Sequence, residues 1–277
     1  MLEKVCFICG AGHSGSTLLG LVLGSHTDCF YAGEARKSQF VGNPQKALRK
    51  RTCKLCGEDC PVWTGFNDGI EDRTAGLYQR IARKAQRGVV IDSTKNVDWL
   101  RDRMADLATD GIPVYLLYLQ RDGRAVINSR LRKYSEKSPA ELIEQWQSQV
   151  ERTNELYNAF SGSKMSLHYE DFARNPEATT RNLTEFLGLD FQPAMMRFDE
   201  FEHHPIGGNN GTQFQVARAQ QLQVVSIRER QKQYYQSHPR GIKLDLRWLR
   251  ELQPEHLDLF ERMAGHTNQP FAWRETE

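Results

Sequence analysis

The run Gly-Ala-Gly-His-Ser-Gly-Ser-Thr at positions 10–17 has the residue types and spacing of a loop that binds phosphate. It follows an apolar, strand-like stretch and precedes a helix-like one, which is where such loops lie. Gly10, Gly15 and Thr17 match the pattern GxxxxGK[ST], whereas Ser16 occupies the lysine position. Backbone N–H groups at the start of the helix can still bind an anion. Because the lysine that reaches the terminal phosphates of a nucleoside triphosphate is missing, the loop favours a different anionic donor, such as a phosphosulfate.

Two more polar runs follow strand-like segments, at 92–95 and 121–129. Ligands of doubly wound sheets bind at the carboxyl ends of the strands, so the runs belong at one edge with the loop. Arg121 and Arg124 would offer two-pronged donors to a phosphate, and Ser129 a hydroxyl. A single arginine after a strand is most often a solvated charge, but three polar motifs at strand ends favour an anion site.

Apolar runs alternate with helix-like segments along the chain, and continuous apolar runs are typical of a parallel sheet covered on both faces. Strands are expected at 4–9, 30–32, 89–91, 113–120 and 165–168. Helices are expected at 16–25, 97–108 and 175–187, and a further helix begins at the capping box at 138–141. Asp92 is expected to cap the helix at 97–108. The predicted fold is α/β, a doubly wound parallel sheet like that of P-loop NTPases, flanked by helices and followed by a helical C-terminal part.

The chain has 277 residues, which predicts a single domain over 1–277. It would carry an insertion at 36–88 with a cysteine-rich segment and a helical extension at 199–277 that covers the cofactor. The 37 basic and 35 acidic residues nearly cancel, so any anion preference must be local and no nucleic-acid partner is expected. Since no leader pattern and no membrane-spanning apolar stretch stand out, a cytoplasmic protein without a membrane partner is expected.

In these motifs the chain resembles the sulfotransferases that use 3′-phosphoadenosine 5′-phosphosulfate, most closely the prokaryotic family related to carbohydrate and tyrosylprotein sulfotransferases. The loop at 10–17 is similar to the 5′-phosphosulfate loop of these enzymes, and 121–129 to their 3′-phosphate motif. The segments 168–189 and 203–209 are similar to a strand-to-helix segment and a cofactor-covering loop. The resemblance implies transfer of a sulfuryl group to an acceptor hydroxyl or amine, releasing adenosine 3′,5′-bisphosphate.

The resemblance also implies roles for individual residues. Lys95 would stabilise charge on the leaving oxygen, and Glu34 is the candidate base, although the relatives have a glutamate doublet there. Pairing of Glu34 with Arg36 is the structural alternative. His13 stands where relatives usually carry arginine or lysine, so it would help only if the bound anion raised its pKa; otherwise it is a polar loop residue. The donor-binding residues expected are Gly12, His13, Ser14, Gly15, Ser16, Thr17, Arg121, Ser129, Gly208 and Asn209.

Cys53, Cys56 and Cys60 have the spacing of three zinc ligands, with His26 or Cys29 as the expected fourth. A second C-x2-C or a suitably spaced histidine pair is missing, so reduced thiols or a disulfide stay open as alternatives. Sulfuryl transfer itself requires no metal, and no metal ligand is predicted for the catalytic site.

Two other functions fit part of the pattern. A P-loop kinase explains the glycine loop and the arginines, but it lacks the lysine, and Asp92 alone is thin support for a magnesium site. A zinc-containing nucleic-acid-binding module explains the cysteines and nearby lysines but leaves the glycine loop unexplained. The acceptor stays open among sugar, lipid, peptide and small alcohol, because its pocket is built from loops.

Overall fold

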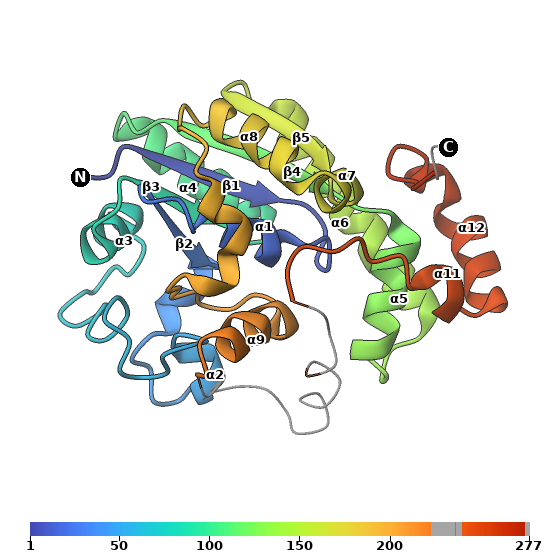
Figure 1. Ribbon diagram of the computed structural model, residues 1–277, viewed down its shortest axis with the longest axis horizontal. Coiled ribbons are helices and arrows are strands. Elements are labelled where there is room, and N and C mark those ends of the chain that lie inside the picture. Colours follow the sequence, from blue (N-terminus) through green and yellow to red (C-terminus); the bar gives the residue numbers. More distant parts are fainter. Residues whose placement is uncertain (223–235, 237–239, 275–277) are drawn as a thin grey trace.

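Five parallel strands form the central sheet of the computed structural model, which describes residues 1–222, 236 and 240–274 (Figure 1). The strand order is β2-β3-β1-β4-β5, and every neighbouring pair is parallel. The strands are β1 (Lys4–Cys9), β2 (Cys29–Gly33), β3 (Val89–Asp92), β4 (Val114–Gln120) and β5 (Ser163–His168). The α/β class and parallel sheet predicted from the sequence are confirmed.

The strands differ in how deeply they are buried. Strands β1 and β3 are almost wholly buried, as their continuous apolar sequences predict, whereas β5 at one edge is partly exposed. Gly10 directly after β1 lets the chain pass close to β4: a Cβ atom there would lie 2.3 Å from the Leu119 carbonyl oxygen. The close approach brings the end of β1 and the end of β4 together at the carboxyl edge of the sheet.

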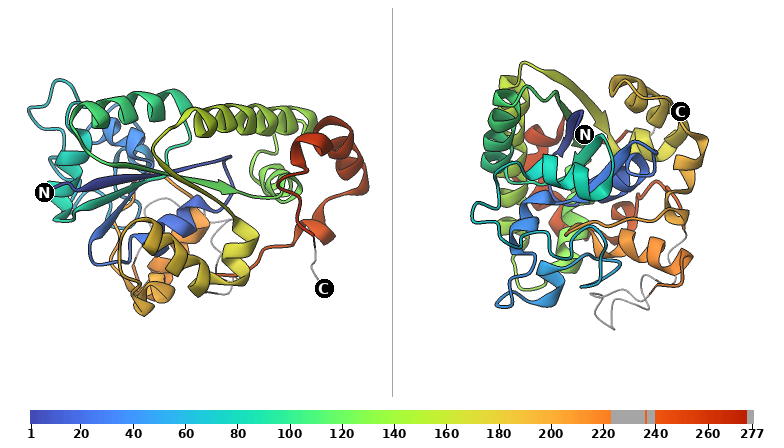
Figure 2. Two further views of the ribbon diagram at one scale, coloured as in Figure 1. Left: turned by 90° about the horizontal axis from the view of Figure 1, so that it is seen from above. Right: turned by 90° about the vertical axis from the view of Figure 1, so that its left-hand side faces the viewer.

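Helices cover both faces of the sheet (Figure 2). Helices α4 (Val97–Thr109) and α6 (Pro139–Ala159) lie on one face, and α1 (Ser16–Leu23), α8 (Pro176–Phe186) and α9 (Asn210–Ala219) lie on the other. The remaining elements are η1 (Ala35–Phe40), α2 (Leu48–Arg51), α3 (Leu77–Ala85), α5 (Gly123–Lys133), α7 (Tyr169–Arg174), η2 (Pro193–Glu200), α11 (Trp248–Glu251) and α12 (Pro254–Asn268).

Local sequence explains where two of these helices begin. Ser138 and Glu141 form a reciprocal capping box at the start of α6, as predicted. Helix α4 is capped by Asn96, whose side chain accepts from the Trp99 N–H. The expectation that Asp92 caps this helix is wrong, because its carboxylate is directed towards Thr94, Tyr78 and Ala35 instead.

The segments outside the sheet layers extend the molecule at both ends. Residues 36–88 contain only short helical elements besides α3, and within the described residues the part after 199 contributes α9, α11 and α12. Part of the predicted extension at 199–277 lies outside the described residues. Across the part of the chain that is described, no helix combines the length and apolar character needed to cross a membrane.

Candidate active site at the carboxyl edge of the sheet

The glycine loop joins β1 to α1 and leaves the start of that helix open. Gly15 adopts a left-handed conformation, with φ of 93°, and no side chain caps α1 or places an acidic group in its first turn. Ser16 and Thr17 occupy that buried first turn, where backbone N–H groups lack intrahelical partners. An uncapped helix start with partial positive charge is suited to bind an anion.

Neighbouring side chains fix the remainder of the loop. Gln149 of α6 accepts a hydrogen bond from the Gly12 N–H at 3.2 Å, and Arg130 donates to the Gly12 carbonyl oxygen at 3.4 Å. Ser14 is buried, and its N–H donates to the Ala11 carbonyl. Gly15 packs on the Tyr169 ring so closely that a Cβ atom would lie 2.6 Å from it. The loop is therefore held rigidly before any ligand binds.

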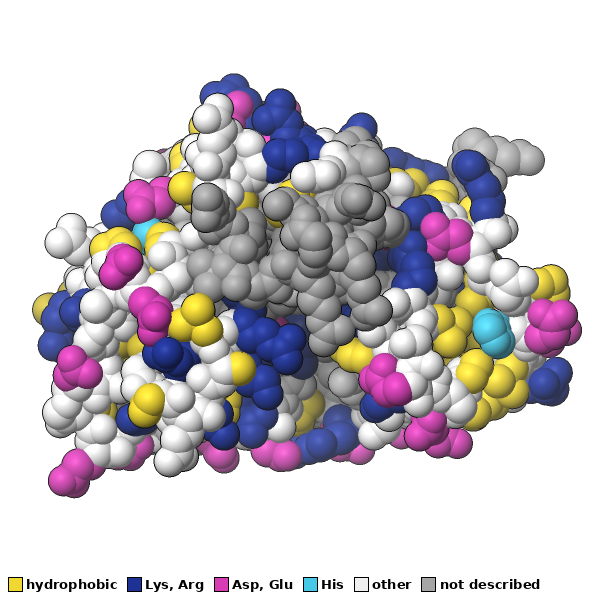
Figure 3. Space-filling view, turned by 90° about the horizontal axis from the view of Figure 1, so that it is seen from below, with side chains coloured by type: hydrophobic (Ala, Val, Ile, Leu, Met, Phe, Trp, Pro, Cys, Tyr) yellow, Lys and Arg dark blue, Asp and Glu magenta, His cyan; other side chains and the backbone are white. Residues whose placement is uncertain are grey.

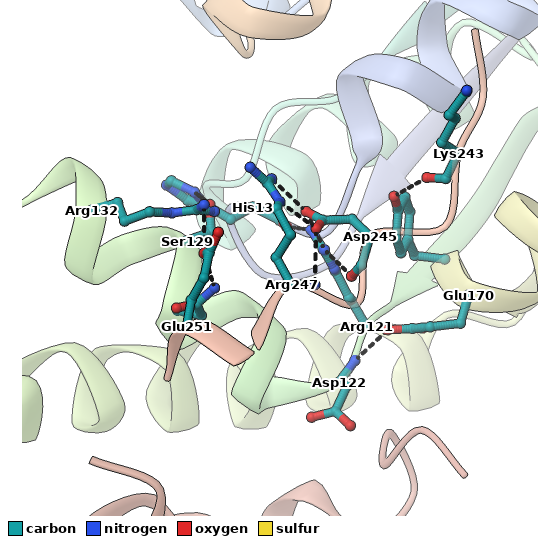
Figure 4. A network of polar contacts seen from close by, with 12 residues as sticks. His13, Arg121, Asp122, Ser129, Arg132, Glu170, Lys243, Asp245, Arg247 and Glu251 are labelled. Atoms are coloured by element: carbon teal, nitrogen blue, oxygen red, sulfur yellow. Dashed lines mark hydrogen bonds and ion pairs between the residues drawn. The ribbon is translucent and has the colours of Figure 1, made fainter. Parts of the chain in front are cut away.

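Arg121 lies directly beside this loop, at the end of β4 (Figure 4). Its Nη1 donates to the His13 carbonyl oxygen at 2.9 Å, and the guanidinium stacks 4.3 Å from the centre of the Tyr169 ring. Its Nη2 donates to the Asp245 carboxylate at 3.1 Å. The buried Nε of Arg121 has no partner among the described residues. The guanidinium thus retains one buried donor that no described residue satisfies.

His13 and Ser129 face each other across the same site. The His13 Nδ1 and Ser129 Oγ atoms are 2.8 Å apart, which connects the glycine loop to α5. Burial, together with the charges of Lys133 and Arg130, lowers the pKa of His13 to about 3. His13 is therefore neutral here, with a backbone φ of 76° that is unusual outside glycine.

Lys95 lies at the carboxyl edge after β3. Its Nζ donates to the Ile8 carbonyl oxygen at 2.9 Å, which places the ammonium group beside the end of β1. Burial lowers the pKa of Lys95 to about 8, although Cys9, Glu34 and Asp92 favour its charged form. A lysine with such a pKa is still largely charged at neutral pH.

Glu34 follows β2 and is held by two contacts. One carboxylate oxygen accepts from the Gly208 N–H at 2.9 Å, and the other is 2.7 Å from the Lys37 ammonium. Burial opposes ionisation, but the Lys37 charge and these hydrogen bonds leave the pKa of Glu34 below its ordinary value. The carboxylate is thus ionised, and its ion-pair partner is Lys37 rather than the Arg36 considered from the sequence.

The segment 203–209 closes over the loop from the side of β2. The Ile206 N–H donates to the Ala32 carbonyl and its carbonyl accepts from the Glu34 N–H, at 2.9 and 2.7 Å. Further along, the Asn209 N–H donates to Thr17 Oγ1 at 2.9 Å, while the Asn209 side chain caps α9. This segment therefore connects Glu34 to the first turn of α1.

Positive charge surrounds the site. On the face drawn in Figure 3, Lys and Arg side chains gather beside a central hollow. The charges acting on His13 come from Arg121, Arg130, Arg132 and Lys133. Although the net charge of the chain is only +2, this local concentration of cations favours an anionic ligand.

Arg124 does not join Arg121 as a second donor to the site. It forms an ion pair with the buried Asp122 carboxylate at 2.6 Å and stacks 4.2 Å from the centre of the Trp248 ring. Because Asp122 caps α5 and is fully buried, Arg124 neutralises a structural carboxylate. This pairing could not be predicted from the sequence, because any arginine after a strand has the same local pattern.

A second group of polar side chains lies apart from the glycine loop. The ligating atoms of Cys53, Cys56, Cys60 and His204 all lie within 4.8 Å of one another. The expectation of His26 or Cys29 as the fourth ligand is wrong. His26 Nδ1 accepts from the Asp28 N–H and its Nε2 donates to the Asp190 carbonyl oxygen, while Cys29 is buried in β2. The six cysteines are all free thiols in this structure.

Several contributors to the site were not foreseen from the sequence. Gln149, Tyr169 and Asp245 contact the loop or Arg121 from positions far along the chain. Arg130 directly follows the predicted phosphate motif, and its position one residue after Ser129 is the only local signal among them.

The fold and the site together define an α/β protein of the P-loop class with a site suited to an anionic ligand. A sulfotransferase family model matches residues 115–193, which include β4, the Arg121 motif and β5. The protein-tyrosine sulfotransferase of Drosophila melanogaster is 23% identical over 217 residues, covering 73% of this chain. The chain is thus similar in sequence to sulfotransferases. It spans 41% of the length of that relative.

Solved structures support the same fold. The sulfotransferase domain from the curacin biosynthetic pathway superposes with a TM-score of 0.57 at 18% identity, covering 85% of this chain and 97% of that one. The sulfotransferase domain of the Synechococcus PCC 7002 olefin synthase superposes with a TM-score of 0.53 at 19% identity, covering 95% of this chain and 96% of that one. Mouse sulfotransferase SULT7A1 complexed with PAP superposes with a TM-score of 0.52 at 11% identity, covering 96% of this chain and 84% of that one.

Proposed function

We propose that this protein transfers a sulfuryl group from 3′-phosphoadenosine 5′-phosphosulfate to an acceptor hydroxyl. The observation that carries the proposal is the buried Arg121, with a free Nε, beside the uncapped start of α1. A donor with two separate anionic ends needs two such positions close together. The PAP complex of the mouse sulfotransferase is consistent with this choice of donor.

Each end of the donor has a set of candidate partners. The N–H groups at the start of α1, the hydroxyls of Ser16 and Thr17, and Lys95 would bind the 5′ end. Arg121 and Ser129 would bind the 3′-phosphate. The phosphate would displace the Asp245 carboxylate from Arg121. His13 is neutral and contacts Ser129, so its proposed part is to orient that hydroxyl.

Glu34 is the proposed base. As the acceptor oxygen forms its bond to sulfur, the acceptor proton passes to the Glu34 carboxylate. The bond from sulfur to the bridging oxygen breaks, and Lys95 stabilises the electron pair that leaves on the 5′-phosphate. The Lys37 ion pair keeps Glu34 ionised and therefore able to accept a proton, but it also makes the Glu34 carboxylate less basic.

A kinase is disfavoured by the environment of Asp92, the one acidic strand end considered for magnesium. Its oxygens accept from the N–H groups of Ala35 and Thr94 and from the hydroxyls of Thr94 and Tyr78. The carboxylate is fully buried among these donors. Its hydrogen bonds therefore hold the Glu34 turn rather than an ion.

The proposal is tested by incubating the protein with the phosphosulfate donor and measuring release of adenosine 3′,5′-bisphosphate with a tyrosine peptide, a sugar, a lipid and a small alcohol. The tyrosine peptide is included because of the Drosophila relative. Glu34→Gln should lower kcat by about 10²–10⁴ with the best acceptor, since proton transfer is lost.

Glu155→Gln is the matched control, because Glu155 is an exposed carboxylate of α6 that pairs with Arg101. Its turnover should equal that of the wild type. A Glu34→Gln variant that retains full kcat would remove Glu34 as the base. Donor binding without transfer to any acceptor class would contradict the proposed reaction as a whole.

A further inference from the structure

Cys53, Cys56, Cys60 and His204, here called the Cys3His cluster, converge between the insertion and the segment 203–209. The Nδ1 atom of His204 is 3.1 Å from the Cys56 sulfur and 3.5 Å from the Cys60 sulfur. Zinc bound to thiolates at about 2.3 Å and to imidazole at about 2.0 Å holds its tetrahedral ligand atoms roughly 3.5–3.8 Å apart. The cluster therefore has the dimensions of a site for one ion.

The backbone around Cys53 is arranged to support a thiolate. The N–H groups of Leu55 and Cys56 are directed at the Cys53 sulfur, at 3.4 and 3.5 Å. The Gly57 N–H donates to the Cys53 carbonyl, and the φ of 74° at Gly57 closes this tight turn. Hydrogen bonds of this kind orient metal ligands and stabilise their charge.

His204 is oriented in the way that metal-binding histidines are. Its Nε2 lies 3.2 Å from the Glu202 carboxylate, which leaves Nδ1 to face the sulfur atoms. A carboxylate on the far ring nitrogen fixes the tautomer and raises the basicity of the ligand nitrogen. The Trp63 indole N–H donates to the His204 carbonyl at 2.6 Å and holds its backbone in place.

We propose that the Cys3His cluster binds one Zn²⁺ ion as a structural site. Three thiolates and one imidazole suit zinc and exclude the hard cations magnesium and calcium. Four side chains complete a tetrahedron and leave no position for water or substrate, which distinguishes a structural from a catalytic zinc. The proposal is independent of the proposed sulfuryl transfer.

The ion would join the insertion to the segment that reaches Glu34. His204 is followed by Pro205, whose carbonyl accepts from the Lys54 N–H at 3.1 Å, and by Ile206, which pairs with β2. Gly208 then donates to the Glu34 carboxylate. Loss of the ion should therefore loosen the segment 203–209 from the turn after β2.

The test is the zinc content of the whole chain, purified with reductant and measured by inductively coupled plasma mass spectrometry. About one zinc per chain is expected for the wild type. Cys56→Ser and His204→Ala should reduce it to background, whereas Cys29→Ser, which alters a buried cysteine outside the cluster, should retain it. Exchange with Co²⁺ should give the intense absorption of a tetrahedral cobalt thiolate.

Wild-type protein that holds no zinc after equilibration with it, and shows no cobalt thiolate absorption, would overturn the proposal. A disulfide among these cysteines in the protein as purified without reductant, persisting in the presence of zinc, would do the same. Retention of zinc by both cluster variants would place the metal elsewhere. If either variant fails to fold, the wild-type zinc content and cobalt spectrum decide the question alone.

Discussion

Lys95 illustrates how burial sets the properties of a single group in this site. Its ammonium lies beside the end of β1, and burial lowers its pKa to about 8. His13 is affected far more strongly: burial and the surrounding cations lower its pKa to about 3. Near neutral pH the site therefore derives its positive charge from lysine and arginine, and not from His13.

The affinity for adenosine 3′,5′-bisphosphate should consequently depend on pH above neutrality. As pH rises through about 8, Lys95 in the free protein loses its charge, so affinity should fall. Calorimetry between pH 6.5 and 9.5 should show this decline in the wild type. Lys95→Met should bind more weakly at pH 7 and lose most of the decline; an unchanged profile would mean that Lys95 does not face the ligand.

At the scale of elements, the segment 203–209 depends on a glycine at the end of β2. Gly33 has a φ of 81°, and a Cβ atom there would lie 2.3 Å from the Ile206 carbonyl oxygen. Only glycine allows the segment to approach closely enough for the Ile206 and Gly208 hydrogen bonds. The position of Glu34 thus depends on backbone packing between two distant parts of the chain.

Gly33→Ala should therefore lower the free energy of unfolding by about 2–4 kcal/mol, since strain in φ adds to the clash. Gly42→Ala is the matched control: its φ is 76°, but a Cβ atom there meets nothing within 4 Å. It should cost only about 1 kcal/mol of φ strain. Urea unfolding measures both, and equal losses would show that the contact with Ile206 contributes nothing.

Sequence reasoning succeeded where the signal was local. The glycine loop, the strand-end motifs and the capping box of α6 each lie in one short stretch, so their elements could be placed. The partners Gln149, Asp245 and His204 could not be found, because they meet their targets only through the tertiary fold. The expected fourth zinc ligands, His26 and Cys29, lie nearer to the cysteines in sequence than His204, which reaches them only in the folded chain.

At the scale of the whole molecule, Glu170 connects the stability of the fold to pH. It lies in the first turn of α7, is 2% exposed, and accepts a hydrogen bond from the Asp122 N–H at 3.1 Å. Burial raises the pKa of Glu170 to about 7 from an ordinary 4.5, against the opposing charge of Arg121. Between pH 4.5 and about 7, Glu170 is therefore protonated in the folded protein and ionised in the unfolded chain.

Because the folded state binds the extra proton, the contribution of Glu170 to stability is complete below about pH 4.5 and is lost as pH rises through 7. At roughly 1.4 kcal/mol per pH unit over the shift from 4.5 to about 7, the loss is about 3.5 kcal/mol. Glu170→Gln should remove this component from the pH dependence of urea unfolding, whereas Glu155→Gln should leave it. Parallel curves for wild type and Glu170→Gln would contradict the assignment.

The most direct measurement of the central claim is calorimetric binding of adenosine 3′,5′-bisphosphate without added metal, compared with ATP and magnesium. The bisphosphate should bind with a Kd in the micromolar range, about −8 kcal/mol. Arg121→Ala should weaken it at least about tenfold, while Arg152→Ala, an exposed arginine of α6, should not. Tight binding of magnesium ATP with no response to the bisphosphate would contradict the account and favour a kinase.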